Sequence, residues 1–148
     1  MTEPPAGLRR GGDVEEEART MRPQPLIAVG DVAASSRWYQ QLLGCASGHG
    51  GTEYEQIVDG DGTLVLQLHA WDAHDHPHMG DPDLRPYGNG VLLWFQVEGF
   101  EAAVARARAL PATILDGPRV NPNANHRELW LRDPDGYVVV LASFSGDV

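Results

Sequence analysis

The stretch that decides the fold is HRELWLRDPDGYVVVLAS, residues 126–143. Its two runs, 126–132 and 137–143, have the length of strands, and the second is mainly apolar with three consecutive β-branched valines. Between them lies Asp133-Pro134-Asp135-Gly136, in which proline fixes φ and glycine takes the left-handed position of a tight turn. The stretch therefore predicts two consecutive strands joined by a tight turn near the end of the chain.

A strand and a helix precede these two strands. Residues 91–97 predict the strand, and the helix is indicated by an apolar stripe at helical spacing: Phe100, Ala103, Val104, Ala107 and Leu110. Pro111 ends this helix because proline cannot continue the helical hydrogen bonding. Residues 113–115 predict a further strand, whereas 116–125, with two prolines and three asparagines, predict irregular structure.

The same order of elements occurs earlier in the chain. Residues 26–30 predict a strand, Asp31 is a helix N-cap candidate, and Gly44 is the matching left-handed C-cap. Two strands, 53–58 and 63–70, are joined by the hairpin sequence Asp-Gly-Asp-Gly. The repetition indicates an α+β fold of two equivalent modules, each with one helix covering one face of a sheet. The other face of each sheet must be covered by the partner module, another chain or a ligand.

Composition excludes several classes of partner. The chain has 148 residues and a formal net charge of −10, which argues against binding to nucleic acid or to anionic membranes. No apolar run approaches the roughly 20 residues of a membrane-spanning helix, and residues 1–22 lack the apolar core of a signal peptide. We therefore expect a cytoplasmic protein. The single Cys45 excludes an intrachain disulfide and is interpreted as a packing residue.

Several motifs in the same order resemble the vicinal oxygen chelate superfamily, which includes glyoxalase I, bleomycin-resistance proteins and extradiol dioxygenases. The matching segments are Val29–Val32, Trp38-Tyr39, Leu42–Gly44, Phe100–Ala103 and Arg132–Tyr137. The resemblance implies two βαβββ modules, 25–70 and 90–145, whose curved mixed sheets surround a central cavity, often in a homodimer. Residues 1–24 are then a flexible tail, and 71–89 form a histidine-rich connecting loop.

The resemblance also implies where a metal would bind, because metalloenzymes of this superfamily take one ligand from each of four strands. The corresponding positions are Gln24 or Pro25, Gln67, Leu92 and Val140. Leucine and valine have no donor atom for a metal ion. We therefore expect the standard metal site, and any cofactor at that site, to be absent.

Strand alternation predicts which side chains face the cavity. The predicted ligand-binding residues are Gln67, His69, Trp71, Leu92, Trp94, Gln96, Glu128, Trp130 and Val140. Such a mainly apolar and aromatic lining with a few polar groups is typical of a site for a small organic molecule. The alternative is that these residues only pack the sheets together, in which case the chain is a dimeric interaction module.

Histidines define a competing hypothesis. His69, His74, His76 and His78 could hold a divalent ion such as zinc, iron, nickel or manganese in a lyase or dioxygenase-like enzyme. The alternative is a solvated or hydrogen-bonded loop. His69, His126 and Glu128 are the candidate catalytic residues, although His126 is also consistent with a surface histidine whose hydrogen bonds are satisfied. The sequence leaves open whether any reaction is catalysed.

Overall fold

The computed structural model describes residues 20–72 and 76–148, so most of the predicted flexible tail lies outside the described residues. The first module contains β1 (Leu26–Val29), α2 (Val32–Leu43), β2 (Ala46–Ser47), β3 (Tyr54–Val58) and β4 (Leu64–Ala70). The second contains β5 (Leu93–Gln96), α3 (Phe100–Ala109), β6 (Thr113–Asn121), β7 (His126–Arg132) and β8 (Val138–Ala142).

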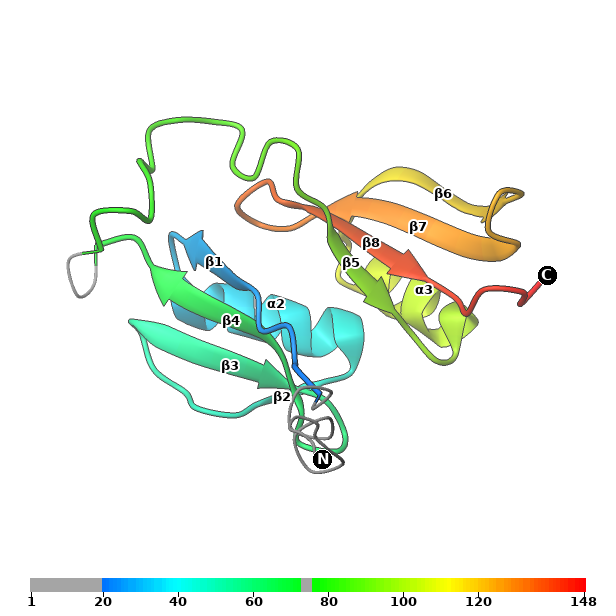
Figure 1. The fold of residues 1–148 in the computed structure, drawn as a ribbon, viewed down its shortest axis with the longest axis horizontal. Helices are drawn as coiled ribbons and strands as arrows, with labels where there is room; N and C mark the ends of the chain where they lie inside the picture. Colours follow the sequence, from blue (N-terminus) through cyan, green and yellow to red (C-terminus); the bar gives the residue numbers. More distant parts are fainter. Residues whose placement is uncertain (1–19, 73–75) are drawn as a thin grey trace, which may run out of the picture.

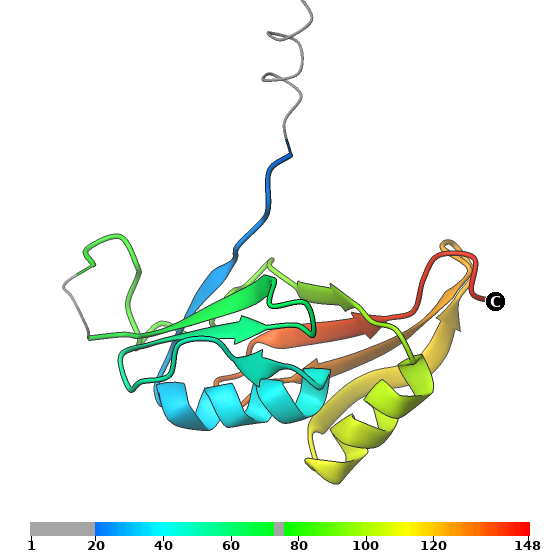
Figure 2. The same cartoon turned by 90° about the horizontal axis from the view of Figure 1, so that it is seen from below.

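Both modules have the same sheet topology. The strand order is β1-β4-β3-β2 in the first sheet and β5-β8-β7-β6 in the second, and in each sheet the first pair is parallel and the others antiparallel. The predicted α+β fold of two βαβββ modules is therefore confirmed. The two sheets lie side by side and are not closed around one another (Figure 1). Both helices cover the same side of this arrangement, which leaves the other side of each sheet open (Figure 2).

Local signals place α2 as predicted. The side chain of Asp31 accepts a hydrogen bond from the backbone N–H of Ala34 (3.0 Å), and Gly44 ends the helix with φ of 66°. Tyr39 and Leu42 on its inner face are fully buried. Half-buried Cys45 follows the helix, and burial raises the pKa of its thiol, which agrees with the predicted packing role.

The turn between β7 and β8 joins the two modules. The carboxylate of Asp133 accepts hydrogen bonds from the backbone N–H groups of Asp135 and Tyr137 (both 2.9 Å), which fix the turn. Its other oxygen accepts a hydrogen bond from the hydroxyl of Tyr39 in α2 (2.6 Å). The hydroxyl of Tyr137 donates to the carbonyl of Ala28 in β1 (2.7 Å). This turn thus attaches the second sheet to the helix and edge strand of the first module.

The structure differs from the prediction in three strands. Residues 116–121 belong to β6 and are not irregular. Two register shifts, between Ile114 and Asp116 and between Asp116 and Arg119, let the strand continue pairing with β7 past Gly117-Pro118. The two-residue strand β2 was not predicted, since so short a segment has no periodicity. Strand β5 begins at Leu93, two residues later than expected.

Candidate functional site

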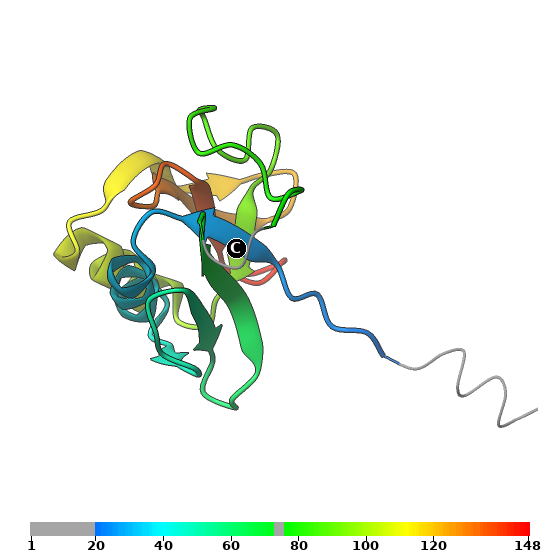
Figure 3. The ribbon, with the colours of Figure 1, turned by 90° about the vertical axis from the view of Figure 1, so that its left-hand side faces the viewer.

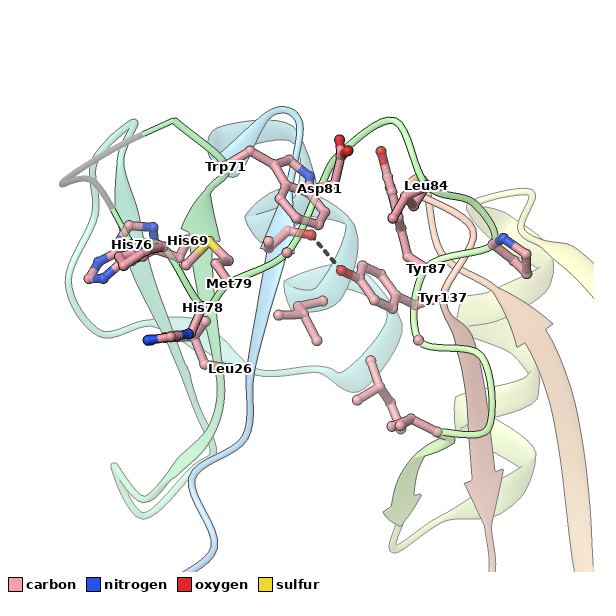
Figure 4. Close-up of a pocket in the computed structure, with 18 residues that line it drawn as sticks. Leu26, His69, Trp71, His76, His78, Met79, Asp81, Leu84, Tyr87 and Tyr137 are labelled. Atoms are coloured by element: carbon pink, nitrogen blue, oxygen red, sulfur yellow. Dashed lines mark hydrogen bonds between the residues drawn. The ribbon is translucent and has the colours of Figure 1, made fainter.

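A cavity of about 720 Å³ lies beneath the segment that connects the two modules (Figure 4). Figure 3 shows this segment arching away from the sheets, above β1. The cavity, called the aromatic cavity below, is lined by Leu26, Ile27, Ala28, His69, Trp71, His76, Pro77, His78, Met79, Gly80, Asp81, Leu84, Pro86, Tyr87, Gly88, Val91, Leu93 and Tyr137. It therefore lies where β1, the end of β4, the connecting segment and the β7–β8 turn meet.

Three aromatic rings form a continuous wall of this cavity. The ring centroids of Trp71 and Tyr87 are 5.0 Å apart, and those of Tyr87 and Tyr137 are 5.6 Å apart. Backbone acceptors hold two of the rings, because the Tyr87 hydroxyl donates to the carbonyl of Pro82 (2.6 Å) and the Tyr137 hydroxyl to that of Ala28. The wall is thus already in place for a planar group.

Glycine is required beside this wall. The backbone of Gly88 has φ of 66°, and a Cβ atom there would lie 3.0 Å from Cδ1 of Tyr137. Any larger residue at this position would combine left-handed backbone strain with a clash against the ring. The connecting segment therefore approaches the second module closely at Gly88.

The indole nitrogen of Trp71 is the least expected feature of the wall. Within the part of the chain that the structure describes, Nε1 of Trp71 is buried and has no hydrogen-bond partner. A buried donor without a partner costs about 1–3 kcal/mol, so native proteins rarely retain one without a reason. An acceptor on a bound molecule would satisfy this donor.

His69 forms the boundary between the aromatic cavity and a second one. Its Nδ1 lies 2.8 Å from the carbonyl oxygen of Ala70, so Nδ1 carries the proton that this acceptor needs. The ring is buried and lies 4.7 Å from the ring of His76. The second cavity, of about 600 Å³, is lined by His49, Gly51, Thr52, Glu53, Tyr54 and His69. The two cavities are therefore neighbours that share one side chain.

A buried carboxylate fixes the loop that carries His49. Glu55 in β3 is 4% exposed, and its two oxygens accept hydrogen bonds from Ser36, Ser47, and the backbone N–H groups of His49 and Gly50, among others. Burial by itself would raise the pKa of Glu55, but these hydrogen bonds outweigh it and lower the pKa to about 2. Glu55 is thus ionised and positions the second cavity from behind the sheet.

Glu128 organises the open face of the second sheet. It is 1% exposed and accepts hydrogen bonds from Nδ2 of Asn121 (2.8 Å), Nε1 of Trp130 (2.9 Å) and Nε2 of His126 (2.6 Å). Burial opposes ionisation, but the hydrogen bonds from these three residues lower the pKa of Glu128 to about 2. The ring of His126 lies 6.0 Å from that of Trp94. The candidate catalytic pair therefore exists as a hydrogen-bonded unit outside the aromatic cavity.

The predicted ligand-binding residues divide into separate groups. His69 and Trp71 line the aromatic cavity, as do His76 and His78. Gln67 lies on the open face of the first sheet. The residues that the structure places outside the aromatic cavity, on the open face of the second sheet or just before β5, are Leu92, Trp94, Gln96, Glu128, Trp130 and Val140. A single chain therefore does not bring all nine residues into one cavity.

Comparison with known proteins gives the family. The model of the Glyoxalase/Bleomycin resistance protein/Dioxygenase superfamily matches residues 22–141. The chain belongs to this superfamily. No curated protein matches the chain in a sequence comparison. The motifs quoted from the sequence therefore identified the superfamily correctly.

Solved structures share the superfamily fold at low sequence identity. A glyoxalase/bleomycin resistance protein/dioxygenase family enzyme from Burkholderia phytofirmans is 22% identical, with a TM-score of 0.66, and the match covers 81% of this chain and 95% of that one. A glyoxalase/dioxygenase from Nostoc punctiforme is 19% identical, with a TM-score of 0.60, and the match covers 85% of this chain and 97% of that one. An integron cassette protein from Vibrio cholerae is also 19% identical, with a TM-score of 0.64, and the match covers 86% of this chain and 97% of that one. Such identities show the fold alone.

The side chains at the superfamily's metal positions do not fit a metal ion. The side chains of Leu92 and Val140 have no donor atom, and that of Val140 is fully buried. The amide of Gln67 is engaged at both ends, because it accepts from the hydroxyl of Tyr54 and donates to the carbonyl of Gln24 (2.9 Å). Hard divalent ions need several donors, and this set offers too few.

The structure describes three of the four histidines in the predicted metal site. His74 lies outside the described residues, so its position relative to His69, His76 and His78 is not defined. Among residues 20–72 and 76–148, no group of three or more His, Cys, Asp or Glu side chains has the arrangement of a metal site. Metal binding by these histidines stays a prediction. In the same described part of the chain, no helix is long and apolar enough to cross a membrane.

Proposed function

We propose that this protein binds a small organic molecule in the aromatic cavity. The observation that carries the proposal is the buried, unpartnered Nε1 of Trp71 in a wall of three aromatic rings. A planar group stacked on this wall would gain apolar contact, and an oxygen or nitrogen acceptor on it would satisfy the indole N–H. The cavity volume of about 720 Å³ is in the range typical of drug-sized ligands.

The proposed binding does not depend on a metal ion. The wall supplies stacking surfaces, and the polar side chains in the rest of the lining include His69, His76, His78 and Asp81. These groups can orient a ligand by hydrogen bonds, which is the usual role of a few polar groups in a mainly apolar site.

We also propose that the chain works as a homodimer. On the open face of the second sheet, the side chain of Trp94 in β5 is 45% exposed, and that of Leu92, just before β5, is 43% exposed. Large apolar groups gathered on one sheet are typical of a surface that another protein covers. Light scattering coupled to size-exclusion chromatography tests this, and the Trp94→Glu variant is expected to be monomeric if this face is the interface.

Binding is tested with N-phenyl-1-naphthylamine, a neutral planar probe whose fluorescence rises in apolar sites. The Trp71→Ala variant removes one end of the wall together with the unpartnered indole N–H, and Trp94→Ala is the matched control on the open face. We expect Trp71→Ala to weaken binding at least tenfold and Trp94→Ala to change it less than twofold. The opposite pattern would move the site to the open face, and absence of binding by the wild-type protein would refute the proposal.

A further inference from the structure

The carboxylates that line the two cavities favour a ligand with positive charge. Histidines apart, the charged side chain in the lining of the aromatic cavity is Asp81, and that in the lining of the second cavity is Glu53. Among the described residues neither lining contains an arginine, although Arg85 lies beside the aromatic cavity with its guanidinium against the ring of Tyr87. The formal net charge of −10 adds a long-range field of the same sign. An anionic group in contact with either lining would therefore meet repulsion from its carboxylate.

The aromatic wall also favours positive charge. The faces of Trp and Tyr rings carry partial negative charge and attract a cation within about 6 Å of the ring centre. The chain already uses this property, because Cζ of Arg85 lies 4.4 Å from the ring centroid of Tyr87. Three such rings next to Asp81 form a surface that combines π faces with a carboxylate.

The carboxylate of Asp81 is held in a defined position. One of its oxygens, Oδ1, accepts a hydrogen bond from the backbone N–H of Asp83 (2.8 Å), which forms a local turn. Figure 4 draws Asp81 at the edge of the cavity with the connecting segment. An ammonium group on a ligand stacked against the rings can therefore approach Asp81 without rearrangement of the backbone.

We propose, on the basis of the proposed function, that the preferred ligand of this cavity is an organic cation: a planar ring system bearing an amine or ring nitrogen that is protonated at neutral pH. The ring system stacks on Trp71 and Tyr87, and the positive charge lies next to Asp81. Because Trp71 offers a donor, the ligand also carries one hydrogen-bond acceptor. The second cavity, across His69, accommodates a polar extension of the same molecule.

Three planar probes of different charge test this inference on the full-length protein. They are 9-aminoacridine, which is a cation, N-phenyl-1-naphthylamine, which is neutral, and 1-anilinonaphthalene-8-sulfonate, which is an anion. The last two differ by a sulfonate group, so their comparison isolates the effect of negative charge. We expect the anion to bind at least tenfold more weakly than the neutral probe and the cation to bind most tightly.

Matched variants test whether the carboxylate of Asp81 causes the preference for a cation. Asp81→Asn keeps the oxygen that accepts from Asp83 but removes the charge, and it should weaken 9-aminoacridine about fivefold while leaving the neutral probe within twofold. Asp83→Asn, in the same segment but outside the cavity lining, should leave both probes within twofold. High salt should weaken the cation in the wild-type protein and have little effect on the neutral probe.

The outcomes separate this inference from the proposed function. If Trp71→Ala abolishes binding of all probes but Asp81→Asn leaves the cation unchanged, or if the anion binds as tightly as the cation, the charge preference is overturned and the binding function stands. If Glu53→Gln weakens the cation and Asp81→Asn does not, the assignment to Asp81 is wrong. If no probe binds the wild-type protein, the proposed function itself fails.

Discussion

Replacing Glu128 by glutamine is expected to destabilise the second module. The substitution preserves the volume of the side chain but turns one acceptor oxygen into a donor, facing a site where Asn121, Trp130 and His126 all donate. At least one buried donor then lacks an acceptor, at about 1–3 kcal/mol, and charge-assisted bonds become neutral ones. We expect the free energy of unfolding to fall by about 2–3 kcal/mol, which corresponds to a decrease in Tm of about 6–12 °C.

Urea denaturation followed by far-UV circular dichroism measures this loss. The matched control is Glu101→Gln, because the side chain of Glu101 is 82% exposed and forms a surface ion pair with Arg127. We expect the control to stay within about 0.5 kcal/mol of the wild-type protein. If Glu128→Gln were as stable as Glu101→Gln, the three hydrogen bonds would not organise this face and the reasoning would be refuted.

Three further predictions concern the pH dependence of stability, the junction between the two modules and the metal content of the protein. The pKa values of Glu55 and Glu128 in the folded protein, both about 2, lie below those of unfolded glutamate, so their stabilisation is complete above about pH 5 and is lost as the pH falls towards 2. Burial raises the pKa of Asp133, so this group opposes the effect of the two glutamates. Urea titrations at pH 7 and pH 3 should therefore show a net fall in the free energy of unfolding of about 2–3 kcal/mol. An unchanged free energy of unfolding would contradict this prediction. The Tyr39→Phe variant removes the hydroxyl that donates to Asp133 at the junction of the modules and should cost about 1–2 kcal/mol in the same assay, more than Tyr54→Phe, whose hydroxyl contacts a neutral amide. Elemental analysis of protein purified without a histidine tag should find zinc, iron, nickel and manganese well below one equivalent per chain; one equivalent that disappears in the His69→Ala, His76→Ala double variant would favour the metal-dependent alternative.

The fold could be predicted because its signals are local. The cap at Asp31, the left-handed Gly44 and the turn from Asp133 to Gly136 each determine the backbone within a few residues, and each recurs in the structure as expected. Their order gave the internal repeat and with it the superfamily. Strand β6 was predicted too short, because continued pairing past Gly117-Pro118 depends on its partner strand β7.

The candidate site could be predicted only in part, because its wall is assembled by non-local contacts. Period-two alternation placed His69 at the end of β4, and Trp71 follows directly. Tyr87 belongs to a segment without periodicity, and Tyr137 reaches the wall only through the junction of the two modules. The sequence placed Tyr137 directly after the Asp133–Gly136 turn, but it did not show that Tyr137 contacts β1 and Tyr87. Likewise, alternation put Glu128 and Trp130 on one face without revealing that they bond to each other.

The central claim, that a ligand binds against Trp71, is tested most directly by NMR of the indole N–H groups. The chain has four tryptophans, Trp38, Trp71, Trp94 and Trp130, whose indole resonances are assigned from single Trp→Phe variants of ¹⁵N-labelled protein. During titration with 9-aminoacridine, the account predicts that the Trp71 resonance moves furthest, because the ring system of the ligand stacks against this indole, while that of Trp38 in α2 stays in place. A Trp71 resonance that does not move while those of Trp94 and Trp130 do would contradict the account.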